Sequence, residues 1–186
     1  MARTGNEIVI AMVGALGTDL EAVQTAIEKA LVEVDYVHHT IRLSSLVTEV
    51  PGYTPSEQCN SDFYDEKINA LMDSGSDIRA HLGGDALARL AILKIRDIRE
   101  TTNKEKSLGS TFEGSSTPLD RTAYIIRSLK HPKEVEFLRS IYGDSFFLFS
   151  AYCPKKVRIQ QLANVIRESR HKHRADEFEA IALKLL

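Results

Sequence analysis

The sequence predicts an α/β protein built in three layers, with a parallel sheet between helices. Short apolar runs typical of strands alternate along the chain with longer segments of helical periodicity. The first run, residues 8–13, is almost continuously apolar, which is typical of a strand buried on both faces. A glycine turn and the start of a helix follow it directly. Strands that alternate with helices in this way form parallel sheets covered on both faces.

The first strand leads into a helix and then into a second strand. The apolar positions of the helix recur at helical spacing: Leu20, Val23, Ile27 and Leu31. Thr18 or Asp19 is its expected N-cap. Apolar and polar residues then alternate over about 36–43, which predicts the second strand.

Two helices and two loops are expected in the middle of the chain. The polar segment 44–62 carries prolines and a glycine, and it is typical of a loop with short local structure. Apolar positions at helical spacing predict helices near 63–73 and from 85 to about 100. The segment of about 101–121 is rich in Ser, Thr and Gly and has no periodicity, so we expect a mobile loop or insertion there.

The second half of the chain repeats the alternation of strands and helices. Strands are expected at 123–128 and 146–152. Helices are expected at 132–142, at about 158–169 and from about 175 onward.

The composition is that of a single globular domain spanning 1–186. With 186 residues, 43% hydrophobic and 27% charged, the chain can bury a sizeable core. Its net charge of -2 gives no whole-molecule reason to expect nucleic-acid or acidic-membrane binding. A signal peptide and an apolar run of about 20 residues are absent, and Cys59 and Cys153 lie far apart, so we expect a cytoplasmic protein without membrane contact. The last residues, 182–186, fall inside an apolar helical pattern, and we expect a piece of a longer protein.

The turn after the first strand has the form of a phosphate-binding loop. It comprises Gly14, Ala15, Leu16, Gly17, Thr18 and Asp19. Backbone N–H groups and a helix N-terminus can surround a phosphate there. A full P-loop also has a lysine, whose position falls on Leu20. Thr18 could contact phosphate or magnesium, and Asp19 would repel phosphate unless it caps the helix. The alternative is a tight structural turn that binds nothing.

Other candidate phosphate or nucleoside contacts follow the predicted strands. They are Ser44, Arg127, Lys130, His131 and Arg158. Ligands of parallel sheets bind at the carboxyl ends of strands, where these residues are expected. The alternatives are a polar strand exit, a solvated turn and a surface basic cluster. No Cys-x-x-Cys, His-x-Glu or Gly-x-Ser-x-Gly motif occurs, so we assign no catalytic residue and no metal ligand.

Four segments together resemble the N-terminal region of antiphage deoxycytidine nucleotide deaminases. They are 10–20, 41–44, 123–139 with its Ser-Leu-Lys-His-Pro-Lys-Glu-Val block, and 141–144. The resemblance covers nearly the whole chain. It implies a P-loop nucleoside or nucleotide kinase-like domain, followed in the parent protein by a zinc-dependent deaminase domain. Such bacterial defence proteins convert dCTP or dCMP to uracil nucleotides and drain the pool that a phage needs.

The resemblance implies a regulatory, nucleotide-binding role for this chain. This chain lacks the deaminase motifs, so zinc would belong only to the deaminase domain of the parent protein. Magnesium would accompany a bound nucleotide. The expected partners are an NTP or dNTP, the deaminase domain, further copies of the chain in a homo-oligomer, and a regulatory RNA. Two alternatives stay open: an active nucleoside or nucleotide kinase, and a non-catalytic module for oligomerisation or regulator binding. Whether the chain is itself an enzyme is left open.

Overall fold

The protein is an α/β domain with a parallel sheet flanked by helices. The computed structural model describes residues 6–50, 52–106, 117–171 and 176–186. Its sheet contains β1 (Ile8–Gly14), β2 (Val37–Arg42), β3 (Thr122–Arg127) and β4 (Phe146–Ala151). All pairs are parallel and the strand order is β2-β3-β1-β4. The expected parallel sheet is therefore confirmed, and its four strands lie close to their predicted positions.

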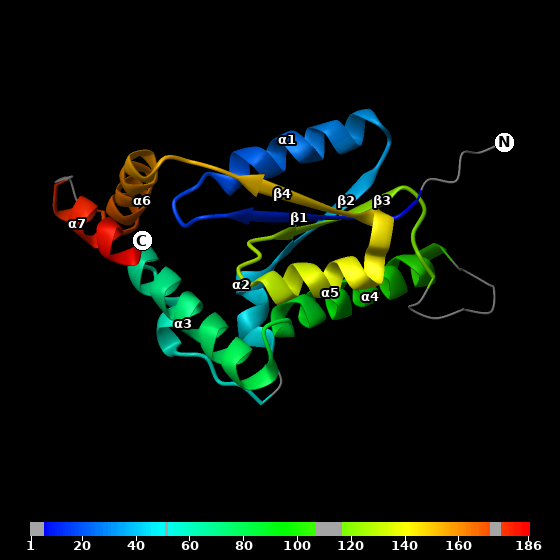
Figure 1. The fold of residues 1–186 in the computed structure, drawn as a ribbon, viewed down its shortest axis with the longest axis horizontal. Helices are drawn as coiled ribbons and strands as arrows, with labels where there is room; N and C mark the ends of the chain where they lie inside the picture. Colours follow the sequence, from blue (N-terminus) through cyan, green and yellow to red (C-terminus); the bar gives the residue numbers. More distant parts are fainter. Residues whose placement is uncertain (1–5, 51, 107–116, 172–175) are drawn as a thin grey trace.

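Helices cover both faces of the sheet (Figure 1). Helix α1 (Leu20–Glu33) lies on one face, where its Leu20 and Leu31 pack on Ile10 and Ile125. Helices α4 (Ala86–Lys106) and α5 (Pro132–Tyr142) lie on the other. Alternation along β1 and β3 supplies apolar side chains to both layers, which explains why both strands are almost wholly buried.

A third group of helices lies beyond the carboxyl ends of the strands (Figure 1). It consists of α3 (Tyr64–Leu82), α6 (Lys155–Ser169) and α7 (Asp176–Leu185). Leu162, Ile166 and Phe178 form the buried centre of this α3–α6–α7 unit. The unit therefore bounds the sheet edge at which a ligand is expected.

Helix α3 extends well past the predicted end at residue 73. The Ser-Gly-Ser run 74–76 has weak helix propensity, yet Ser74, Gly75 and Ile78 are buried. Most of the stability of a helix in a protein comes from tertiary packing, and this buried face outweighs the weak local propensity.

The prediction of a mobile loop at about 101–121 is wrong for the first residues of that segment, which are helical. Helix α4 continues to Lys106, supported by hydrogen bonds such as Thr101 Oγ1 to Asp97 O at 3.0 Å. The last turns of α4 are polar and lack an apolar stripe, but they continue a helix whose earlier turns are packed on the sheet. Residues 107–116 of that loop lie outside the described residues.

The polar segment 44–62 contains the short local structure that was expected. Helix α2 (Leu43–Leu46) and the 3-10 turns η1 (Val47–Glu49) and η2 (Glu57–Asn60) lie there. A further 3-10 turn, η3 (Gly143–Ser145), precedes β4. Among the helices that the structure describes, none combines the length and apolar character needed to cross a membrane.

Candidate anion-binding site

The carboxyl ends of β1 and β3 lie side by side at the point where the sheet changes direction. From β1 the chain passes through α1 to β2, on one side of the sheet. From β3 it passes through α5 to β4, on the other side. Two neighbouring strands whose connections diverge define the switch point at which open α/β sheets bind ligands. The glycine turn, Gly14–Asp19, and the loop that follows β3 begin at this switch point.

The glycine turn is held tightly against the start of α6. Thr18 N donates to Ala15 O at 3.0 Å, which closes the turn. Gly17 has φ +82°, and an added Cβ would lie 2.7 Å from Arg158 O. Only glycine fits both this backbone conformation and this close approach. Leu16 packs against the α3–α6–α7 unit, so the turn is fixed from outside as well.

Asp19 caps α1, one of the two caps predicted. Its Oδ1 accepts a hydrogen bond from Ala22 N at 2.9 Å. One carboxylate oxygen thus binds a free N–H group of the first helical turn, which is what an N-cap residue does. The neighbouring Thr18 Oγ1 is buried and has no hydrogen-bond partner among the described residues. A buried hydroxyl without a partner is costly, and it marks the turn as a place for a further polar group.

Lys130 brings a positive charge to the glycine turn. Its Nζ donates a hydrogen bond to Gly14 O at 3.1 Å. Within the described parts of the chain, no carboxylate lies within ion-pair distance of this amine. Lys130 as a whole keeps exposed surface. The pKa of its amine is nevertheless lowered, first because of burial of the amine and second because of the nearby charge of Arg79. The charge of Glu134 acts on Lys130 in the opposite direction to these two causes, but the two side chains form no ion pair. A lysine of this kind at a switch point favours an anionic ligand.

Glu134 fixes the loop that carries Lys130. Its fully buried carboxylate accepts from Lys130 N at 2.8 Å, from His131 N at 3.0 Å and from Arg79 Nε at 2.8 Å. His131 completes a capping box, because its Nδ1 accepts from Lys133 N at 3.2 Å. The loop is therefore rigidly placed before any ligand arrives.

The corner between α3 and α4 supports the same loop from outside. An added Cβ on Gly84 would lie 2.5 Å from the ring of His131, so the imidazole is packed on the glycine. Arg79 reaches Glu134 from α3. Sequence reasoning missed these residues. Glu134 could have been found as the third residue of a capping box after His131-Pro132, but Arg79 and Gly84 carry no local signal.

Two of the predicted arginines use part of their hydrogen-bonding capacity in contacts with neighbouring elements. Arg127 ends β3, and its Nη1 lies 3.2 Å from Gln24 Oε1 and 3.6 Å from Glu21 Oε2. Arg158 donates to Leu16 O at 3.0 Å and through Nε to the carbonyl that precedes Pro154, at 3.2 Å. Each keeps further N–H groups, since a guanidinium has five.

Ser44 lies apart from the other candidates. It belongs to α2, which follows β2, and β3 separates β2 from β1. The hydrogen bonds of the described residues do not connect Ser44 with the glycine turn. The structure therefore places Lys130 and Arg158 in contact with the glycine turn. Arg127 contacts side chains of α1, His131 follows Lys130 in the same loop, and Ser44 lies outside this group.

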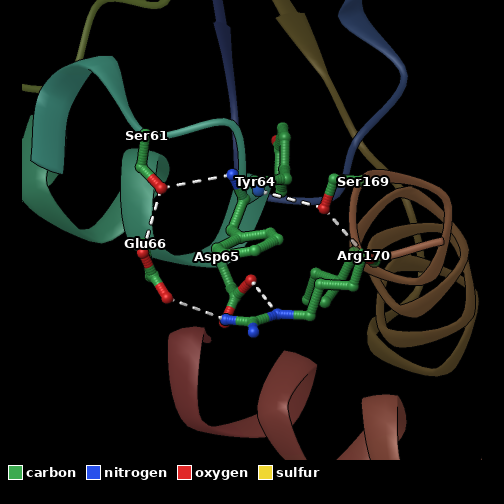
Figure 2. Close-up of polar contacts among 8 residues, drawn as sticks. Ser61, Tyr64, Asp65, Glu66, Ser169 and Arg170 are labelled. Atoms are coloured by element: carbon green, nitrogen blue, oxygen red, sulfur yellow. Dashed lines mark hydrogen bonds and ion pairs between the residues drawn. The ribbon is translucent and has the colours of Figure 1, made fainter. Parts of the chain in front are cut away.

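Arg170 joins the start of α3 to the end of α6 (Figure 2). Its guanidinium donates to both carboxylate oxygens of Asp65, at 2.9 and 2.7 Å, and to Glu66 at 3.1 Å. Ser169 Oγ accepts from Tyr64 N at 3.0 Å. The hydrogen bond from Arg170 holds the pKa of Asp65 below its usual range. These contacts, which we call the Arg170 latch, hold α3 and α6 together near the carboxyl ends of the strands (Figure 1).

No protein-family model matches this chain, and no curated protein sequence does. The fold and the site define an α/β protein in which a lysine from the loop after β3 contacts the glycine turn at the switch point of the sheet.

Proposed function

We propose that this chain is a nucleotide-binding regulatory module that holds the phosphates of its ligand between the glycine turn and Lys130. The observation that carries this proposal is the bond from Lys130 Nζ to Gly14 O. A lysine from the loop after β3 supplies the charge that the turn itself lacks at Leu20. Backbone N–H groups at the start of α1 add partial positive charge from the same side.

Magnesium would arrive with the nucleotide. The chain offers it the Thr18 hydroxyl, which is buried and lacks a partner in the described structure. Magnesium keeps several waters and is held mainly by phosphate oxygens, so one protein hydroxyl is sufficient. When bound, the ion would neutralise charge on the phosphates.

Calorimetry with ATP, GTP, dCTP and dTTP, with and without magnesium, tests the proposal. We expect Lys130→Ala to abolish most of the binding. Lys133→Ala is the matched control, because Lys133 is exposed on the same segment and its side chain makes no described contact with the turn. Failure of all four nucleotides to bind, or equal binding by Lys130→Ala, would contradict the proposal.

A kinase is the second candidate function, since the same lysine could stabilise a transferring phosphoryl group. Phosphoryl transfer depends on positioning and charge stabilisation. The assay is phosphate transfer from labelled ATP to deoxynucleosides and deoxynucleotides. Transfer that Lys130→Ala abolishes would favour the kinase, whereas binding without transfer favours the regulatory module.

By its resemblance to antiphage deoxycytidine nucleotide deaminases, we propose that the module serves a zinc-dependent deaminase domain acting on dCTP or dCMP. A His-x-Glu and a Cys-x-x-Cys motif in the downstream reading frame would support this. The remaining alternative is a scaffold for oligomerisation or for a regulator such as RNA. Bulky substitutions at Gly14 and Gly17 that leave the parent activity and its regulation unchanged would favour the scaffold.

A further inference from the structure

Strand β4 ends the sheet with an unusually apolar edge. It pairs with β1 on one side, and on its other side no described strand pairs with it. Phe147, Leu148 and Phe149 are 46%, 38% and 45% exposed. Tyr152, just after the strand, is 88% exposed. The β4 edge, residues 146–152, therefore presents unpaired backbone groups together with large apolar side chains.

This composition is that of an inner strand. Phe147 and Phe149 align with Ile10 and Met12, so they lie on the α1 face, while Leu148 lies on the opposite face. Edge strands are normally short, charged, or interrupted by proline, because an open apolar edge pairs with other chains. The β4 edge has none of these protections between Phe146 and Tyr152.

The charges beside the β4 edge favour a second copy of this chain as its partner. Asp144 lies just before the strand, while Lys155 and Lys156 lie shortly after it. All three are exposed, and none forms an ion pair with another described residue. An antiparallel copy would place Asp144 of each chain beside the two lysines of the other.

We propose that two copies of this chain associate through antiparallel pairing of their β4 edges. A two-fold axis perpendicular to the sheet runs near Phe149 and joins both sheets into one. This axis keeps equivalent faces on the same side, so the two Phe149 side chains meet on the α1 face. Backbone bonds, apolar contact and two sets of opposite charges then act together at one self-complementary edge.

The first experiment measures the molar mass of the full chain by light scattering and sedimentation over a range of concentrations. We expect a dimer, whereas Phe149→Lys is a monomer. Val32→Lys is the matched control, because Val32 is 62% exposed on α1, away from the β4 edge. A monomeric wild-type chain, or a dimer that survives Phe149→Lys, overturns the proposal.

A charge exchange tests the arrangement without touching the apolar strand. Asp144→Lys alone should weaken the dimer several-fold, and adding Lys155→Asp and Lys156→Asp should restore it. Hydrogen exchange should show protection of β4 amides that rises with protein concentration. If the triple variant is no better than Asp144→Lys, or if β4 protection is independent of concentration because another strand of the same polypeptide covers it, the antiparallel dimer is wrong.

Discussion

Gly17 packs so closely on Arg158 that even a methyl group on its Cα would lie 2.7 Å from the Arg158 carbonyl oxygen. The glycine turn and the first turn of α6 are therefore in backbone contact. Arg158 strengthens the contact by donating to Leu16 O at 3.0 Å. The shape of the turn depends on a helix that begins more than a hundred residues later.

Gly17→Ala should destabilise the protein and weaken nucleotide binding. The left-handed φ costs about 1–2 kcal/mol for an alanine, and overpacking adds about 1–3 kcal/mol. Gly52→Ala is the control, because Gly52 has φ +74° but open space around it. Urea unfolding and calorimetry should show a smaller loss of stability and unchanged binding for Gly52→Ala. Equal effects of the two substitutions would show that steric contact with Arg158 is unimportant.

Glu134→Gln should lower stability by about 3 kcal/mol, because it leaves the guanidinium of Arg79 without its buried carboxylate. It should also weaken nucleotide binding, since the Lys130 loop loses its anchor. Glu136→Gln on the same helix is exposed and serves as the control. Thermal unfolding and calorimetry measure both effects. Wild-type stability in Glu134→Gln would exclude the anchoring role.

Two glycine-to-alanine substitutions, one in the turn between α3 and α4 and one inside α3, should have different effects on stability. Gly84→Ala places a Cβ 2.5 Å from the His131 ring, so the ring must move, and stability should fall by about 1–3 kcal/mol. Gly75 lies inside α3, where its nearest neighbour is the flexible end of Arg79 at 3.2 Å. Gly75→Ala should be neutral or stabilise by up to about 1 kcal/mol. Chemical unfolding of both variants checks this, and a loss in Gly75→Ala as large as in Gly84→Ala would contradict it.

The Arg170 latch should weaken in acid. The pKa of Asp65 is lowered from 3.8, so at low pH the unfolded chain binds this proton more readily than the folded chain. The stability that Asp65 contributes is therefore complete above the pKa of the unfolded chain, 3.8, and it is lost as the pH falls through the lower pKa of the folded protein. Arg170→Met should reduce stability by about 1–2 kcal/mol at neutral pH and flatten this acid dependence.

Arg167→Met, on the same helix, is the control for the latch, since no described ion pair involves Arg167. Thermal unfolding between pH 2.5 and 7 in the two variants gives the comparison. An acid dependence in Arg170→Met equal to that of the control would contradict the role of the latch.

The strands, the glycine turn and the loop after β3 could be predicted because their signals are local. A continuous apolar run identifies β1, and the glycine turn and Lys130 follow strands directly in the sequence. The support of the Lys130 loop could not be predicted, because Arg79 reaches Glu134 across 55 positions of sequence. Side-chain pairs of this kind depend on tertiary packing and leave no periodic trace.

Helix ends were the weakest predictions, for the same reason. The Ser-Gly-Ser run in α3 has poor intrinsic helix propensity, yet the helix continues because Ser74, Gly75 and Ile78 are buried by tertiary packing. Arg158 was expected to contact a ligand, and the structure adds a second task, since it ties the glycine turn to α6. Its contact with a ligand stays a prediction.

The central position of β1 has a consequence for how the chain acquires its fold. Val9 of β1 lies beside Tyr124 of β3 and beside Phe146 of β4, both far downstream. In a nascent chain β1 therefore stays unpaired until more than a hundred further residues have been made, and an exposed apolar strand promotes aggregation. Because both neighbours of β1 are needed to close its two edges, the shortest version of this domain that folds must extend at least through Ala151.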